Sequence, residues 1–288
     1  MNDLAKSLDS EATNAQRMGS MLVARGKLSA RDLSAIANAQ AQSGQRFGDI
    51  AMKLGLVTQA DINAILAEQF AYTAPPASTS KLDPQLSTLF QPDGLQAEAL
   101  RSLRSELLVR YFQPQPQRSL AIIASDNADQ IGLTAANLAI SFSQLGHRTL
   151  LIDTNLRNSN LNPLFGIHPY APGLADRLAG RQTLAPIPIS EVPGLWLMPA
   201  GTQAPNPQEL LAGNPYRDFL HQSQQLFDVV LISTAPMNSN RDAQLVAVQS
   251  GAALLVTHTH HTRTRALADI CQRLRDLGVR LVGTALYR

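Results

Sequence analysis

The 288-residue sequence is short of several residue types, and each shortage narrows what the protein can be. Cys271 is its one cysteine, which excludes an internal disulfide and fits a reducing compartment. Lysine is absent after Lys81. No apolar run approaches the roughly 20 residues that a membrane-spanning helix needs, and Met1–Asp3 does not start a signal peptide. We therefore expect a cytoplasmic protein.

Net charge and length add two constraints. The formal charge of +2 is too small to indicate a nucleic-acid-binding protein. A hydrophobic content of 44% is enough for a buried core, and 288 residues suggest two domains. The Pro- and Ser-rich stretch 72–80 is typical of a linker. We expect one domain at 1–72, a linker at 73–94 and a second domain at 95–288.

The amino-terminal region contains a tandem repeat, with copies at 17–40 and 46–69 that are offset by 29 residues, as between Arg17 and Arg46. A fixed period indicates one supersecondary unit used twice. Two like half-sites suit a ligand that has two like halves. The recurring positions are Arg17, Met18, Gly19, Leu22, Val23, Gly26, Leu28, Leu33 and Gln40, matched by Arg46, Phe47, Gly48, Ala51, Met52, Gly55, Val57, Ile62 and Gln69.

Each copy predicts a helix with a defined start. Ser29–Asp32 and Thr58–Asp61 have the [ST]-x-x-[DE] pattern of a capping box. Gly26 and Gly55 are placed where a preceding helix can end in a left-handed residue. A small helical scaffold without a ligand is the alternative interpretation. It does not explain why Arg-x-Gly and the terminal glutamine are repeated.

The repeated pattern resembles the MshEN domain, which occurs in some type II secretion and type IV pilus ATPases and binds cyclic di-GMP. The resemblance covers about residues 15–72 and implies that all the recurring positions except Ala51 form a cyclic di-GMP site. The chemistry fits, because arginine can fork onto guanine or phosphate and glycine lets backbone amides approach closely. Lys27, Ala37 and Ala51 depart from the larger apolar residues usual in that family.

The second half of the chain alternates short β-type runs with amphipathic segments. This alternation predicts βαβ units, and so an α/β domain whose mostly parallel sheet has helices on both faces. A helix is expected at 95–111 ahead of the first strand. The strand runs are Leu120–Ile123, Thr149–Ile152, Leu195–Met198, Val229–Ile232, Ala253–Val256 and Val279–Val282.

This half resembles P-loop proteins of the MinD/ParA type, and more narrowly the bacterial tyrosine autokinases of polysaccharide export. The resemblance implies, as partners, a membrane chain-length regulator or a kinase homologue, and through them a position at the inner membrane. Glu98, Arg101 and Arg104 match the E-x-x-R-x-x-R oligomerisation helix of those kinases, with a solvated helix face as the alternative. The matching segments are Ala135–Ala139, Ser141–Asp153, Leu156–Arg157, Pro163–Gly166, Phe227–Ile232, Pro236, Arg241–Ala243 and Gly251–Val256.

The phosphate-binding loop departs from that family. Without gaps, the family's G-x-G-K-[ST] falls on Ala128-Asp129-Gln130-Ile131-Gly132. A phosphate cradle uses glycines, a lysine for the phosphates and a hydroxyl for Mg²⁺. Here Ala128 and Gln130 replace the glycines, Ile131 replaces the lysine, and Gly132 replaces the hydroxyl.

The two strand-end motifs that bind metal in that family also differ in this sequence. The family's I-D-x-D is Ile152-Asp153-Thr154-Asn155 here, and its I-D-T-x-P has Ser233 in place of the acid. Asp153 is thus the one acid kept of three, so we expect no bound ATP or Mg²⁺, no catalytic residues and no metal site. His258, His260 and His261 are expected in a solvated loop.

These features together predict a non-enzymatic cyclic di-GMP receptor with an inactive kinase-like domain that regulates exopolysaccharide synthesis through protein contacts. The alternative is a divergent but active ATPase or tyrosine autokinase of polysaccharide export, regulated by cyclic di-GMP. A scaffold that binds neither ligand is the third possibility. Self-association is an expected further contact.

Overall fold

The chain folds into two compact units, Met1–Ala74 and Pro75–Arg288. The computed structural model describes residues 18–43, 45, 47–59, 61–62, 65, 80–113, 119–181, 184–259 and 264–287. Within these ranges no helix is both long and apolar enough to cross a bilayer.

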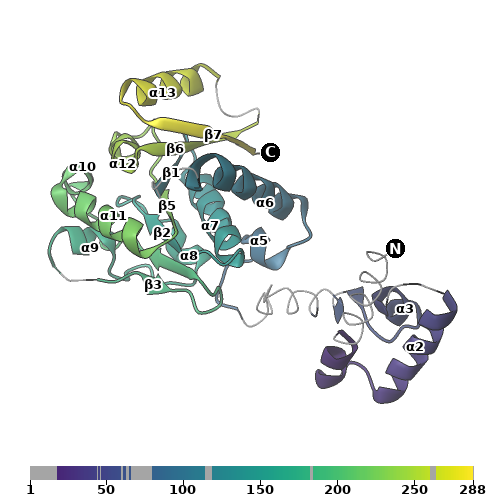
Figure 1. Cartoon of the computed structure of the whole chain (residues 1–288). Helices are drawn as coiled ribbons and strands as arrows, with labels where there is room; N and C mark the ends of the chain where they lie inside the picture. Colours follow the sequence, from purple (N-terminus) through teal and green to yellow (C-terminus); the bar gives the residue numbers. More distant parts are fainter. Residues whose placement is uncertain are drawn as a thin grey trace. The chain divides into compact units, whose positions relative to one another are not determined.

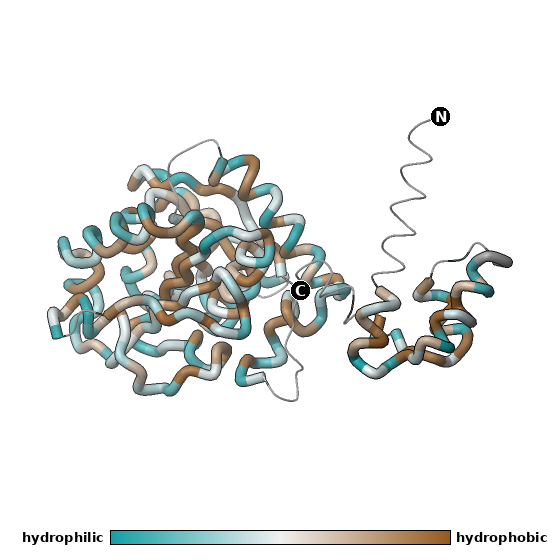
Figure 2. Tube along the Cα trace, turned by 60° about the horizontal axis from the view of Figure 1, so that its bottom comes forward, coloured by the Kyte–Doolittle hydropathy of each residue, from teal (hydrophilic) through white to brown (hydrophobic). Residues whose placement is uncertain are grey.

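The amino-terminal unit is helical and has its own core. It contains a helical stretch at 18–24, then α2 (Ala30–Ser43) and α3 (Phe47–Lys53). Figure 2 shows apolar and polar residues alternating along these helices, as expected for segments that bury one face. The core is formed by Leu22, Leu28, Ile36, Phe47, Ile50, Ala51, Val57, Ile62 and Ile65.

The two repeat copies have the same local structure. Gly26 and Gly55 both adopt φ = 68°, and their amides donate to the carbonyls of Val23 and Met52, each at 2.9 Å. The helix preceding each glycine therefore ends in a left-handed residue, as the sequence predicts.

Both capping boxes are confirmed. The Asp32 carboxylate accepts from the amide and the hydroxyl of Ser29 at 2.8 and 2.7 Å, and the Asp32 amide donates back to the Ser29 hydroxyl. Asp61 and Thr58 make the same three contacts at 3.0, 2.7 and 3.2 Å. Sequence repetition at the 29-residue offset is thus structural repetition.

The carboxyl-terminal unit contains a seven-stranded sheet in the order β3-β4-β2-β5-β1-β6-β7. Every neighbouring pair is parallel except β3 with β4. The mostly parallel sheet of the prediction is confirmed. The strands are β1 (Ser119–Ile123), β2 (Thr149–Asp153), β3 (Ile187–Pro188), β4 (Leu195–Met198), β5 (Val229–Ser233), β6 (Ala252–His258) and β7 (Arg280–Tyr287).

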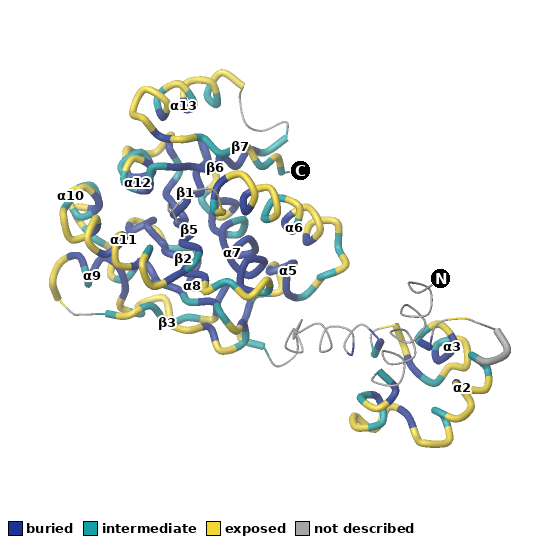
Figure 3. Tube along the Cα trace, viewed as in Figure 1, coloured by how far each residue is buried: buried dark blue, intermediate teal, exposed yellow. Residues whose placement is uncertain are grey.

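Helices cover both faces of this sheet (Figure 1). Along β1, Leu120 and Ile122 face the helices α5 to α8, whereas Ala121 and Ile123 face α9 to α13. The central strands are buried along their whole length (Figure 3). The helices are α5 (Ser87–Phe90), α6 (Leu95–Leu107), α7 (Ala128–Gln144), α8 (Leu161–Leu164), α9 (Leu174–Leu178), α10 (Pro207–Ala212), α11 (Asn214–Leu226), α12 (Asp242–Ser250) and α13 (Thr264–Asp276).

Two details differ from the sequence prediction. The helix expected at 95–111 changes after α6 into a π-helix, η1 (Leu108–Phe112), which turns the buried Tyr111 hydroxyl toward the Ser119 carbonyl at 2.6 Å. Residues 80–94, expected as linker, belong to the α/β unit. Leu82, Leu86 and Leu89 are buried in its core because the chain already packs there before α6 begins.

Candidate functional site

Polar residues gather where β1, β2 and β5 end. Asp153 ends β2 and Ser233 ends β5, and the two are paired Cα partners in neighbouring strands. Ser125 follows β1, which pairs with β5 on its other side. In open α/β sheets, ligands bind at the carboxyl ends of the strands where the strand order reverses. We name Ser125, Asp153 and Ser233 the strand-end cluster.

Helix α7 begins shortly after Ser125 in the chain. Asn127 precedes the helix with φ = 59°, a left-handed conformation that asparagine tolerates better than most residues. Its side-chain oxygen accepts from the Gln130 amide at 3.1 Å, so it caps the helix. The first turn of a 17-residue helix presents backbone amides and the positive end of its dipole, which favour anions.

Asp153 is fully buried and its carboxylate has several donors. It accepts from the Asn155 amide at 2.9 Å and from the Ser159 hydroxyl at 2.8 Å. Burial raises the pKa of Asp153 to about 6, against the opposing effect of these hydrogen bonds and of others from the Asn160 and Leu161 amides. Near neutral pH this carboxylate is therefore mostly ionised inside the protein.

Asn160 joins the loop after β2 to α7. Its side-chain amide nitrogen donates to the Ala128 carbonyl in the first turn. A Cβ atom on Gly132 would lie 2.7 to 2.8 Å from the Asn160 amide atoms, closer than real contacts allow. Glycine at 132 therefore permits Asn160 to approach the helix backbone.

Buried side-chain oxygens of this region that have no protein hydrogen-bond partner within the described ranges include Ser125 Oγ, Ser233 Oγ and Asn160 Oδ1. Buried polar groups are nearly always satisfied, so such a group needs an explanation. All three are hard oxygen donors of the kind that Mg²⁺ takes, and Asp153 adds a carboxylate nearby. The residues present thus fit a metal held between protein oxygens and phosphates.

An ion pair links two of the segments that follow these strands. Arg157 Nε lies 2.8 Å from Asp242 Oδ2, and the Asp242 side chain is only 1% exposed. The pair ties the loop after β2 to the start of α12. Among the described residues, no group of three or more His, Cys, Asp or Glu side chains is placed to hold a metal without further ligands.

The structure thus brings together most of the predicted nucleotide-site residues. Asp153, Asn155 and Ser233 lie at neighbouring strand ends, while Ala128, Gln130, Ile131 and Gly132 form the first turns of α7. Ile131 is fully buried in the core. Sequence reasoning missed Ser125, Ser159 and Asn160, although the run of asparagine and serine after an apolar strand is a signal that could have found them.

Several predicted cyclic di-GMP residues belong to the amino-terminal core. Leu22, Leu28, Phe47, Val57 and Ile62 are buried. Partly buried members are Met18, Val23, Leu33, Gln40, Gly48 and Met52, whereas Gly19 is buried and Gly26 and Gly55 are exposed. Arg17, Arg46 and Gln69 lie outside the described residues, as do His260 and His261.

Of the predicted oligomerisation residues, Glu98 is exposed and Arg101 is partly buried. Arg101 pairs with Glu98 in the same helix at 2.6 Å. Arg104 instead donates to the Ser141 carbonyl at 2.9 Å and so joins α6 to α7. The role of Glu98 and Arg101 in self-association stays a prediction.

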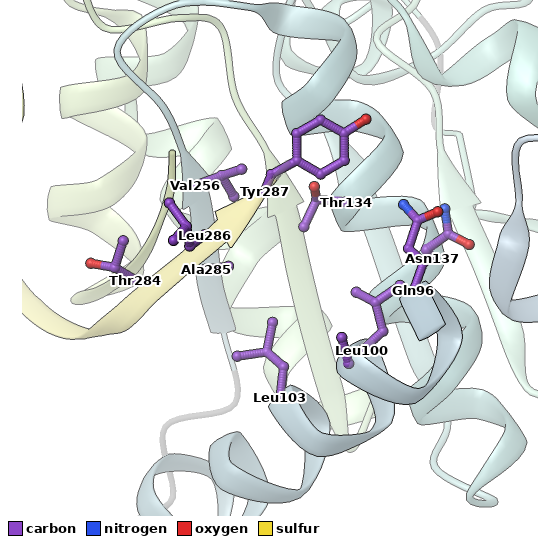
Figure 4. Close-up of a pocket in the computed structure, with 11 residues that line it drawn as sticks. Gln96, Leu100, Leu103, Thr134, Asn137, Val256, Thr284, Ala285, Leu286 and Tyr287 are labelled. Atoms are coloured by element: carbon purple, nitrogen blue, oxygen red, sulfur yellow. The ribbon is translucent and has the colours of Figure 1, made fainter. Parts of the chain in front are cut away.

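A separate cavity of about 270 Å³ lies between α6, α7 and the ends of β6 and β7. Figure 4 shows Leu100 and Leu103 of α6 on one side and Ala285 and Leu286 of β7 on the other, with the Tyr287 ring at its edge. No member of the strand-end cluster lines it.

Comparison with known proteins defines first the class, a P-loop-type α/β protein. The kinase domain of the Escherichia coli tyrosine kinase ETK superposes with a TM-score of 0.68 and 26% identity, over 74% of this chain and 84% of that domain. A cobyrinic acid a,c-diamide synthase from Mycobacterium smegmatis, with bound ADP and magnesium, has the same fold (TM-score 0.51, 18% identity, 59% of this chain and 73% of that one). No protein-family model matches the chain.

Sequence relatives then give the family. Over 67% of this chain, the sequence is 32% identical to the tyrosine-protein kinase Ptk of Acinetobacter johnsonii. Over 54% of this chain, it is 30% identical to the tyrosine-protein kinase CpsD of Streptococcus pneumoniae. It spans 26% of Ptk and 69% of CpsD. The chain belongs to the bacterial tyrosine-protein kinase family.

These findings correct two predictions from the sequence. An inactive domain is contradicted by relatives named as tyrosine-protein kinases at about 30% identity and by the match to a kinase domain. The expected absence of ATP and Mg²⁺ is contradicted by solved structures of the same fold that hold an ATP analogue or ADP together with magnesium.

The sequence prediction was wrong because it treated the loss of individual side chains as the loss of nucleotide and metal binding. Helix amides bind phosphates without a lysine. Mg²⁺ keeps several waters and commonly takes one or two carboxylates plus phosphate oxygens, so the loss of two of three acids does not exclude it.

Proposed function

We propose that the α/β domain binds ATP with Mg²⁺ at the strand-end cluster and acts as a divergent tyrosine-protein kinase. The observation that carries the proposal is the group of buried oxygens without protein partners beside the start of α7, in a chain that spans 69% of CpsD. Bound ATP would supply the phosphoryl group, and Mg²⁺ would offset charge on its phosphates.

The chain's own residues would divide this work. Asp153 and Ser233 hold the metal from two adjacent strands, and the α7 amides hold the phosphates. Since no lysine follows Lys81, neither α7 nor the loop before it supplies a lysine to the phosphates, and the amides and the metal would balance part of their charge. Weaker nucleotide affinity than in a lysine-containing loop is the expected consequence.

We further propose that the amino-terminal unit binds cyclic di-GMP and regulates this domain. The support is the repetition itself. Both copies keep the Arg-x-Gly sequence, and both have the same glycine turn and capping box. A symmetric ligand with two guanines suits a site built from two copies of one unit.

The biological setting we propose is polysaccharide export, with a membrane chain-length regulator or a kinase homologue as partner. The support is family membership and the Glu98–Arg101 pair on α6, in which Glu98 is exposed and Arg101 partly exposed. Contact with such a partner would bring the chain to the inner membrane.

A thermal-shift panel on the full chain tests the ligands together. ATP with Mg²⁺, ADP with Mg²⁺ and cyclic di-GMP should each raise the unfolding temperature, because a ligand that binds only the folded state stabilises it. GMP at the same concentration is the control for the dinucleotide. No shift with either adenine nucleotide would refute the kinase proposal, and no shift with cyclic di-GMP would refute the sensor.

A further inference from the structure

Asn160 has one half of its carboxamide fixed and the other half unused. Its amide nitrogen donates to the Ala128 carbonyl, which can only accept, so the nitrogen and oxygen positions are defined. Its side-chain oxygen is buried and has no protein hydrogen-bond partner within the described residues. An acceptor therefore lies beside the first turns of α7 without a donor from the described part of the chain.

The position of that oxygen is significant. It lies 2.7 Å from the place where a Cβ on Gly132 would be. In a P-loop, the residue at this point of the helix contributes a hydroxyl to Mg²⁺. Gly132 has no side chain, and the Asn160 carboxamide fills the space that one would occupy.

The backbone of Asn160 also reaches the acidic part of the site. Its amide donates to the Asp153 carboxylate, and the preceding residue, Ser159, donates to the same carboxylate through its hydroxyl at 2.8 Å. One short loop thus holds the Asn160 oxygen between Asp153 and α7.

We propose that Asn160 Oδ1 is a ligand of the nucleotide's Mg²⁺ and replaces the hydroxyl that residue 132 lacks. The inference rests on the proposed binding of ATP with Mg²⁺. Amide carbonyl oxygens are ligands for hard divalent cations, and Mg²⁺ needs few protein ligands when phosphates and waters supply the rest. Gly132 and Asn160 are then a compensating pair, because the glycine makes room for the ligand that replaces its side chain.

A purely structural role is the competing explanation, in which Asn160 only ties the loop to α7 through its amide nitrogen. The two roles use different atoms. Asn160→Asp keeps an oxygen and loses the donor, whereas Asn160→Ala loses both. Asn158→Ala is the matched control, because Asn158 is an exposed asparagine of the same loop.

The test is an equilibrium titration of a fluorescent ADP analogue into the full-length protein, at a series of Mg²⁺ concentrations and in EDTA. In wild type, Mg²⁺ should increase the affinity for the analogue. Asn160→Ala should raise the Mg²⁺ concentration that gives half of this increase by about 10- to 100-fold, a loss of metal affinity typical of disturbed metal sites. Affinity in EDTA should stay within about twofold, since one metal ligand adds little without the metal. Asn160→Asp and Asn158→Ala should keep a normal Mg²⁺ requirement.

A double variant, Gly132→Ser with Asn160→Ala, returns the hydroxyl to the helix. Its Mg²⁺ requirement should fall back most of the way to that of wild type. Circular dichroism melts verify that each variant folds. The assignment of Asn160 as a ligand would be wrong if Asn160→Ala needed no more Mg²⁺ than wild type, or if Asn160→Asp needed as much as Asn160→Ala. Neither result would argue against nucleotide binding itself. Failure of the wild type to bind the analogue at all would overturn the proposed function as well.

Discussion

Lys27 in the first repeat copy forms an ion pair with Asp61 in the second, with 2.9 Å between Nζ and Oδ1. Asp61 also accepts from the Thr58 hydroxyl and amide, so one carboxylate caps a helix and joins the two copies. The second copy has Leu56 at the position equivalent to Lys27. The two halves of the repeat therefore share a fold but differ in chemistry.

The Asp61 contacts predict a pH dependence. Hydrogen bonds from Thr58, and then Lys27, lower the pKa of Asp61 to about 2. Because this folded-state pKa is below that of the unfolded chain, about 3.9, the stabilisation is present above pH 4 and is lost as the pH falls toward 2. The melting-temperature gap between wild type and Asp61→Asn should narrow over that range in calorimetric melts. Asp49→Asn, at an exposed site, is the control. A gap that stays constant from pH 6 to pH 2 would contradict this.

Cyclic di-GMP binding is predicted to depend on the two repeated arginines. Arg17→Ala and Arg46→Ala should each cost about 1.5–3 kcal/mol of binding free energy, the usual value of a charged hydrogen-bonding partner. Isothermal titration calorimetry on the full chain measures this, with Arg31→Ala, an exposed arginine of α2, as the control. Unchanged affinity in the double variant would remove the arginines from the site.

A third prediction concerns the π-helix. The Tyr111 hydroxyl donates to the Ser119 carbonyl at 2.6 Å in a fully buried setting, and burial raises the pKa of Tyr111 to about 12. Tyr111→Phe should cost about 0.5–1.5 kcal/mol in the free energy of unfolding, measured by urea denaturation. Tyr170→Phe, at a residue that is 87% exposed, should cost less than about 0.5 kcal/mol. Equal costs at the two sites would show that the hydrogen bond contributes nothing.

A fourth prediction tests whether Arg101 of α6 takes part in a protein interface. Arg101→Glu places like charges beside Glu98 and should dissociate a complex with itself or with a kinase homologue, as measured by light scattering. Arg110→Glu is a charge reversal outside the predicted motif, because Arg110 of η1 pairs with Glu106 of α6 and has a more exposed side chain than Arg101, 73% against 24%. An Arg101→Glu complex as stable as wild type would place the interface elsewhere. Arg104 is unsuitable for this test, since it holds α6 to α7.

Much of the architecture follows from the sequence alone. The runs at Val229–Ile232 and Leu195–Met198 are continuous and apolar, and both become buried parallel strands because apolar surface on both faces needs cover. The two-residue strand β3 was missed, since Ile187–Pro188 is too short for a periodic signal. Capping boxes were predicted correctly, because the contacts that form them are only three residues apart.

The nucleotide site was harder to predict for a physical reason. Motif spacing locates Asp153 and Ser233, but Asn160 reaches α7 only through tertiary packing across 32 residues. A residue lost from one motif can be replaced by a side chain from a distant loop. The motif comparison shows which family residues are replaced in this sequence, but the conclusion about activity drawn from it was wrong.

The most direct test of the central claim is ATP turnover by the full chain, measured as phosphate release in the presence of Mg²⁺. Turnover should require Mg²⁺ and should fall by about 10²-fold or more in Asp153→Asn, which keeps the size of the side chain but removes its charge. Circular dichroism confirms that the variant is folded. Phosphate release equal to a buffer blank in the wild type, or unchanged in Asp153→Asn, would contradict a kinase that works through the strand-end cluster.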